Sequence, residues 1–128
     1  MKFHPLFISI IVSLIAFVSL IEGHTINVEN KLVRGTWGLG AATDYLGSGN
    51  FDWDHDNSAI DQNWSIAHNG FDLTIPDDQN ITTFYLVFGV SGSTEQDKWR
   101  GPFDNNQDYC WHFHGHIDSW KVYPCGSQ

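Results

Sequence analysis

Residues 82–90, Thr-Thr-Phe-Tyr-Leu-Val-Phe-Gly-Val, decide the fold. Every second residue of this stretch is apolar, in the series Phe84, Leu86, Phe88 and Val90. The residues between them are of mixed polarity. Because successive side chains of a strand point to opposite faces, the alternation predicts a strand with one apolar face. Such a strand is typical of the centre of a sheet that packs against a second sheet.

Short aromatic and β-branched segments, separated by Gly, Asn and Asp, extend this pattern along the chain, and no run shows a clean helical period. The expected strands are 25–29, 35–39, 49–54, 63–68, 71–75, 82–90, 98–101, 109–114 and 120–123. Asn69-Gly70 between two of them is typical of a tight hairpin turn. The sequence therefore predicts one small all-β domain, a β-sandwich with a Greek-key or partly open barrel arrangement.

The amino-terminal segment is typical of a secretory signal peptide. Lys2 gives a positive start, an apolar run covers residues 6–21, and Gly23 is a small residue before the expected cut. No later apolar stretch reaches the roughly 18 residues of a membrane-spanning helix. We therefore expect residues 1–23 to be removed. Residues 24–128 would then form an extracellular domain with no transmembrane segment.

The formal net charge of the chain is -9 at pH 7. Proteins bind nucleic acids and anionic lipid headgroups through clusters of Lys and Arg, and this negative charge would repel both. We therefore expect no nucleic-acid partner. A neutral glycan, a zwitterionic lipid, a cation or a basic extracellular protein is more compatible with this charge.

Two covalent features follow from export. Both cysteines, Cys110 and Cys125, lie after the expected leader. An even count in an oxidising compartment predicts one disulfide between them. Asn63 and Asn80 each begin an Asn-x-Ser/Thr sequence, and are therefore candidate N-glycosylation sites.

The segment 109–116, Tyr-Cys-Trp-His-Phe-His-Gly-His, is the densest group of metal-ligand side chains. In a strand, His112 and His114 point to one face, and His116 joins them if the strand continues past Gly115. Two such imidazoles can share a zinc or copper ion, which takes three or four donors. The alternative is that these histidines are half-exposed residues opposite a core-facing side.

His24 would become the first residue after cleavage. A free amino-terminal histidine offers its amine and an imidazole nitrogen to copper. One further histidine, His112 or His114, would complete the T-shaped brace found in copper-dependent polysaccharide oxygenases. A secreted copper- or zinc-binding protein is therefore the second functional hypothesis.

Carboxylates alternate along one short segment, at Asp52, Asp54 and Asp56. This spacing begins like a calcium loop. Asn57 stands where a helix-flanked loop needs Gly and Asn63 stands where it needs Glu, which argues against an EF-hand. A simpler calcium site in a β-loop remains a candidate, and a solvated acidic loop above Trp53 is the alternative.

Catalytic motifs are missing from the sequence: it has no G-x-S-x-G elbow and no Gly-rich phosphate loop before a helix. The disulfide would leave no free nucleophilic cysteine. Aspartates beside apparent turns are explained by local capping of backbone groups. We therefore expect a protein that binds and does not catalyse.

Aromatic residues are abundant after the expected leader, with 6 Trp, 4 Tyr and 6 Phe, and exceed what a small core needs. Five tryptophans neighbour turn residues: Trp37, Trp53, Trp64, Trp99 and Trp120. Exposed rings near Asp, Asn and Gly are typical of surfaces that stack on sugars or sit among lipid headgroups. The leading hypothesis is a secreted binding protein for a glycan, membrane lipid or receptor, with Trp53, Trp64 and Trp99 in its site.

A series of residues from 70 onward is similar in order and rough spacing to a known family. It comprises Gly70-Phe71-Asp72-Leu73, Phe84-Tyr85, Trp99, residues 106–109, Gly115 and Ile117-Asp118-Ser119. The series resembles the carboxy-terminal half of the aegerolysins, which implies a small acidic β-sandwich that recognises membrane lipids. The family's Trp-Asp-Cys-Pro-Trp-Gly segment is replaced here by residues 86–89, so no lipid-binding residue is carried over.

A second set of residues points to a different partner. It comprises Ile26-Asn27-Val28-Glu29-Asn30, Thr82-Thr83-Phe84-Tyr85 and Cys110-Trp111. These segments resemble the plant self-incompatibility S-protein homologues, which implies a small secreted signalling ligand. Members of that family usually have four cysteines, whereas this chain has two.

Overall fold

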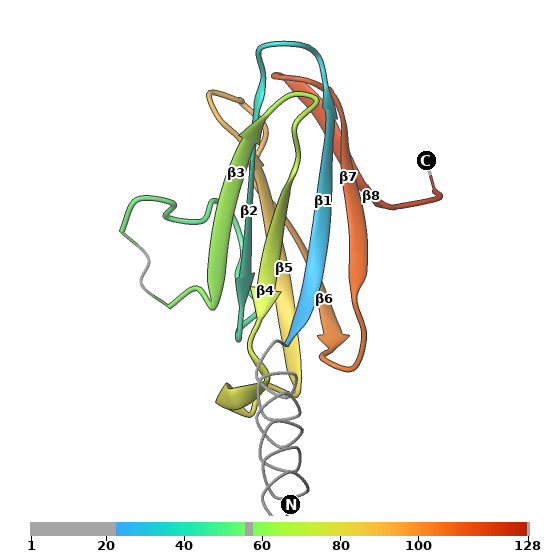
Figure 1. Cartoon of the computed structure of the whole chain (residues 1–128). Coiled ribbons are helices and arrows are strands. Elements are labelled where there is room, and N and C mark those ends of the chain that lie inside the picture. The colour runs from blue at the N-terminus through green and yellow to red at the C-terminus, as the bar shows by residue number, and fades with distance from the viewer. Residues whose placement is uncertain (1–22, 56–57, 128) are drawn as a thin grey trace, which may run out of the picture.

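The computed structural model describes residues 23–55 and 58–127 (Figure 1). The strands are β1 (His24–Leu32), β2 (Trp37–Thr43), β3 (Asp61–Ile66), β4 (Phe71–Ile75), β5 (Thr83–Val90), β6 (Lys98–Asp104), β7 (Tyr109–His116) and β8 (Ser119–Pro124). A single-turn 3₁₀ helix, η1 (Asp77–Gln79), precedes β5. No helix among these residues is long and apolar enough to cross a membrane. The expected signal peptide, apart from Gly23, lies outside the described residues.

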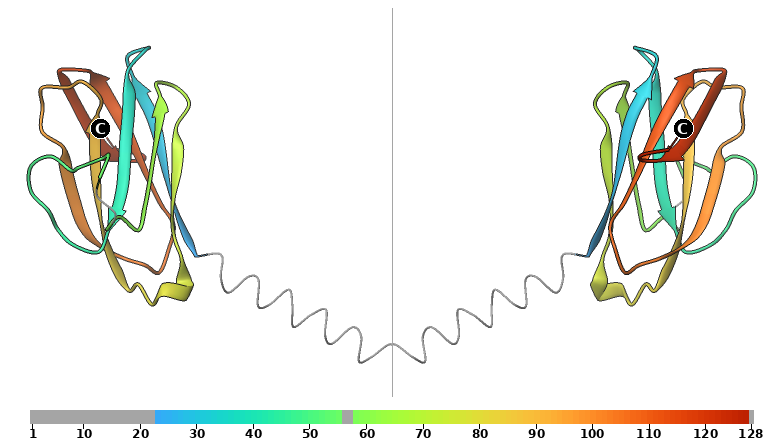
Figure 2. Two further views of the ribbon diagram at one scale, coloured as in Figure 1. Left: turned by 90° about the vertical axis from the view of Figure 1, so that its left-hand side faces the viewer. Right: turned by 90° about the vertical axis from the view of Figure 1, so that its right-hand side faces the viewer.

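The strands form two four-stranded sheets that pack face to face, as the side views of Figure 2 show. The first sheet has the order β4-β1-β7-β8 and the second has the order β3-β2-β5-β6. Only the β1–β7 pair is parallel among the described strands. The chain changes sheet after β1, β3, β4 and β6, in the manner of Greek-key sandwiches. The prediction of an all-β sandwich is confirmed.

The core lies between the sheets and is built from the alternation that the sequence shows. Phe84, Leu86 and Phe88 of β5 are fully buried, and β5 lies between β2 and β6 in the second sheet. From the first sheet, the ring of Phe113 meets that of Phe88 edge to face, with centroids 5.7 Å apart. Trp120, 1% exposed, packs against Phe113 in the same core.

The predicted disulfide is confirmed. Cys110 in β7 is bonded to Cys125, just after β8. The backbone N–H of Cys125 also donates to the carbonyl of Cys110, 2.9 Å away. The bridge therefore fastens the last described residues to the outer face of the first sheet.

The hairpin expected at Asn69-Gly70 is wrong, although a turn does occur there. β3 pairs with β2 and β4 pairs with β1, so this turn carries the chain from one sheet to the other. His68 and Gly70 have positive φ values of 78° and 80°. Their N–H groups donate to the carbonyl of Asn30 in β1 and to Ser65 Oγ in β3, one residue from each sheet. A local Asn-Gly signal identifies a turn and does not say which strands pair beyond it.

The strand expected at 49–54 is also wrong. These residues belong to the β2–β3 loop, residues 44–60, whose described part folds against the outer face of the second sheet. The N–H of Phe51 donates to the Asp97 carboxylate and not to a neighbouring strand. Alternating aromatic residues here reflect side chains that pack on a sheet from outside.

Candidate functional site

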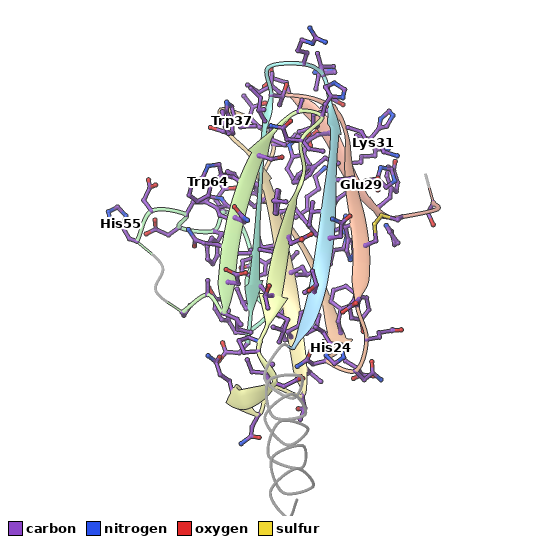
Figure 3. All side chains as sticks on the ribbon, viewed as in Figure 1. His24, Glu29, Lys31, Trp37, His55 and Trp64 are labelled. Carbon is purple, nitrogen blue, oxygen red and sulfur yellow. A yellow bond between two sulfur atoms is a disulfide. The ribbon has the colours of Figure 1, made fainter. Side chains whose placement is uncertain are left out.

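The outer face of the second sheet carries two exposed tryptophans. Small residues such as Gly40 face the core, so the odd-numbered residues of β2, including Trp37 and Leu39, face outward. Leu39 is paired with Trp64 of β3 across the sheet. Trp37 is 44% exposed and Trp64 is 54% exposed. Figure 3 shows their side chains on the same side of the sandwich.

A third tryptophan reaches this face from the β2–β3 loop. The indole Nε1–H of Trp53 donates to Asp97 Oδ2, 2.9 Å away, and the N–H of Phe51 donates to the same oxygen at 2.9 Å. Beneath them, a Cβ at Gly89 would lie 2.5 Å from Asp97 Oδ1 and 3.0 Å from the Trp53 ring. Glycine at position 89 therefore allows the carboxylate to lie over β5 and hold the loop.

A small apolar cluster under the loop completes this attachment. Phe51 and Val87 are buried there, and the rings of Trp53 and Trp99 pack against them. The indole N–H of Trp99 donates to the carbonyl of Gly49, 2.9 Å away. Trp99, expected in the ligand site, thus lies where it anchors the loop.

The rings of Trp37, Trp53 and Trp64 line one cavity of about 420 Å³. Its lining residues are Trp37, Leu39, Trp53, Asp54, Gln62, Trp64 and Ser91. The structure thus brings together two of the tryptophans assigned to the site, Trp53 and Trp64, and adds Trp37. Leu39, Gln62 and Ser91 come from three different segments, and no local motif in the sequence marks them.

A second cavity of about 420 Å³ adjoins the first and shares four of its residues. The shared residues are Leu39, Trp53, Asp54 and Ser91. Its far end is polar and acidic, with Ser93, Glu95 and Asp97 in the lining. We call the two cavities together the tryptophan groove. One end of this groove is aromatic, and the other carries carboxylates.

Two of these carboxylates have structural partners. Burial raises the pKa of Asp97, although the hydrogen bonds from Phe51 and Trp53 oppose this shift. The hydrogen bond from the Lys98 ammonium, 2.9 Å away, holds the pKa of half-buried Glu95 below its usual value. Asp97 therefore retains the loop, and Glu95 is neutralised by an ion pair.

Replacing Asp97 with asparagine tests the raised pKa of this carboxyl. The pKa of Asp97 is raised above 3.8, the value expected for an unfolded chain, so the folded protein binds this proton more tightly. The contribution of Asp97 to stability is therefore present at low pH and is lost as the pH rises through the folded pKa. Asparagine keeps an acceptor oxygen and has no such proton. The free energy of unfolding of Asp97→Asn minus that of the wild type should therefore increase with pH. Urea denaturation at about pH 3 and about pH 7 measures it, and a difference that decreases would contradict the assignment.

The histidines assigned to a metal site lie apart in the structure. His24 Nδ1 is 3.1 Å from Asn105 Oδ1 and 3.7 Å from Asp77 Oδ1, at the start of β1. His112 pairs with Glu29 in the parallel β1–β7 ladder. Five residues of strand therefore separate His24 from the level of His112, which corresponds to about 16 Å. His114 pairs with Lys31, two residues farther along β1, so the structure places neither His112 nor His114 beside His24.

Within β7, the outward residues are the expected ones. Trp111 and Phe113 face the core, and His112 and His114 lie on the opposite side. His112 is only 3% exposed, its ring packs on Tyr123, and its Nε2 is 2.9 Å from the Ser127 carbonyl. His114 and His116 are exposed.

Across the described residues, one group of three candidate metal donors lies close together, formed by Glu29, Cys110 and Cys125. The two sulfurs of this group are bonded to each other and offer no thiolate. For calcium, Asp52 Oδ1 contacts the N–H and ring of His55, Asp54 lies in the groove, and Asp56 is outside the described residues.

The two glycosylation candidates differ in setting. Asn63 lies in β3, where its amide donates to the Asp72 carbonyl and its side-chain oxygen accepts from the N–H of Trp64. Asn80 is exposed just after η1 and has a positive φ of 54°. Asn80 is thus the more accessible of the two side chains.

No protein-family model and no curated protein matches the sequence. A comparison with solved structures finds the crystal structure of listeriolysin O, with a TM-score of 0.44 and 12% sequence identity. The alignment covers 84% of this chain and 23% of that chain, so this chain spans about a quarter of the structure it matches. No residue role is transferred from this similarity.

Proposed function

We propose that this protein is a secreted, non-enzymatic binding protein that holds a saccharide in the tryptophan groove. The observation that carries the proposal is the meeting of Trp37, Trp53 and Trp64 around one cavity on a single face. The flat apolar faces of such rings stack on the C–H faces of sugars, while the indole edges can still bond to water or protein. Two of these rings are about half exposed, which a purely structural role does not require.

The polar residues of the groove support a sugar over a wholly apolar ligand. Asp54, Gln62 and Ser91 line the same cavity as the three rings and offer hydrogen-bonding groups to hydroxyls. Gln62 Nε2 donates to the Trp53 carbonyl, which ties β3 to the loop. A cavity of this size falls in the usual range of small-ligand sites.

Removal of the two exposed rings is the direct test. Trp37→Ala combined with Trp64→Ala should weaken binding of β-1,4-linked tetrasaccharides of glucose or N-acetylglucosamine by roughly 10-fold or more, because stacking by each ring is lost. Isothermal titration calorimetry measures this loss. The melting temperature should change little, since substitutions of exposed side chains cost little stability.

Ile117→Ala supplies the control, because Ile117 is a 41% exposed apolar residue that does not line the groove. It should leave saccharide affinity unchanged. A membrane lipid, the ligand class suggested by the aegerolysin-like residues, is tested in parallel with phosphatidylcholine and sphingomyelin vesicles. Binding to vesicles with no binding to either tetrasaccharide would replace the carbohydrate proposal with a lipid one.

A further inference from the structure

We infer that the saccharide recognised by this groove carries a free amine, and that Asp54 and the tryptophan faces hold its ammonium group. This inference rests on the proposed carbohydrate function and specifies its ligand. Asp54 lines both cavities of the groove, and so lies between its aromatic end and its acidic end.

Asp54 is the groove carboxylate that remains available to a ligand. Asp97 accepts hydrogen bonds from Phe51 and Trp53, and Glu95 is paired with Lys98. Asp54 is exposed, and within the described part of the chain its side chain has no hydrogen bond or ion pair. An ammonium group in the groove would supply a partner for this charge.

The aromatic lining independently favours a cation. The face of an indole ring carries negative electrostatic potential and attracts an ammonium group within about 6 Å of its centre. Trp53 and Trp64 line the cavity that Asp54 also lines. The formal net charge of -9 adds a long-range attraction for positively charged ligands.

Calcium fits these groups less well than an amine does. Calcium takes about six to eight oxygen ligands. Among the described residues, Asp54 belongs to no group of three or more close metal-donor side chains. One carboxylate beside aromatic faces is instead sufficient for a charge-assisted N–H···O hydrogen bond.

Three tetrasaccharides with the same β-1,4 backbone and different groups at carbon 2 test the inference. Glucose presents a hydroxyl, N-acetylglucosamine a neutral amide and glucosamine an amine. Isothermal titration calorimetry at low salt and mildly acidic pH should show the glucosamine tetramer binding roughly 10-fold more tightly than the glucose tetramer, as a charge-assisted hydrogen bond predicts. Added salt should reduce this preference, because ions screen an exposed charge pair.

Asp54→Asn should abolish the preference, so that the glucosamine and glucose tetramers bind this variant with similar affinity, because asparagine keeps an acceptor oxygen for hydroxyls and removes the negative charge. Glu29→Gln is the matched control, because it also removes one negative charge but lies on the outer face of the other sheet, where Figure 3 shows Glu29. This control should retain the preference. Its loss in both variants would assign the effect to overall charge and overturn the role of Asp54.

Different results would contradict saccharide binding in the tryptophan groove and the preference for an amine. The wild type could bind all three tetrasaccharides with equal affinity, and the double tryptophan substitution could abolish this binding. That result would support the carbohydrate function and overturn the preference for an amine. A glucosamine preference that persists in Asp54→Asn would overturn the role of Asp54 in holding the ammonium group. Absence of binding to all three would refute the carbohydrate function, and the amine preference with it.

Discussion

Phe113→Ala is expected to lower the free energy of unfolding by about 3–5 kcal/mol, the largest stability loss we predict for one side chain. Phe113 is fully buried and contacts the rings of Phe88 and Trp120, so truncation would leave a cavity between the two sheets. Domains of this size are stabilised by only about 5–15 kcal/mol in total. The variant should therefore unfold at a much lower urea concentration, as followed by circular dichroism.

Trp64→Ala is the comparison for this experiment, because it also removes a large aromatic ring from a strand. Trp64 is 54% exposed and faces away from the core. Its truncation should change the free energy of unfolding by about 0.5 kcal/mol or less. Similar losses in both variants would show that Trp64 is a packing residue and would remove its role in the groove.

Replacing both cysteines, Cys110→Ser with Cys125→Ser, is expected to lower the free energy of unfolding by about 3 kcal/mol. The bridged residues are 15 positions apart, and without the bridge the unfolded chain regains the freedom of that loop. The bridge lies on the first sheet, opposite the tryptophan groove. Saccharide affinity measured well below the melting temperature should therefore be unchanged.

Reduction of the wild type supplies the control for the disulfide prediction. A reductant should lower the wild-type melting temperature to that of the double variant and should not affect the variant itself. A variant as stable as the oxidised wild type would show that β7, β8 and the residues after them are held by their backbone and core contacts alone.

The core was predictable where a strand alternates apolar and polar residues, and less so in β3 and β6, which bury one residue and none. The alternation in residues 82–90 identified a central strand, and Phe71, Leu73 and Ile75 form a similar apolar series in β4. The alternation of apolar and polar residues shows which face of the strand is buried, and this does not depend on which strand lies beside it. The choice of neighbours is set by long-range packing, which is why a correct turn at Asn69-Gly70 gave a wrong pairing.

The site was less predictable because it depends on contacts between distant segments. Asp97 holds Phe51 and Trp53 from 46 and 44 residues away, and no spacing rule in one sequence reports that contact. Trp53 and Trp64 could be selected as surface rings from their polar neighbours. The same reasoning selected Trp99, whose ring packs against Phe51 as that of Trp53 does but lines neither cavity of the groove. Neighbouring turn residues therefore do not distinguish a ring that lines the groove from one that lies beneath the loop.

The apolar cluster beneath the β2–β3 loop is separate from the main core. We therefore expect the described part of the loop around Phe51 and Trp53 to open while the two sheets remain folded, with a smaller free energy than global unfolding. Amide hydrogen exchange should then show fast exchange at Phe51 and slow exchange at Phe88. A ligand seated against Trp53 would slow the exchange at Phe51, because binding stabilises the closed loop relative to the open one.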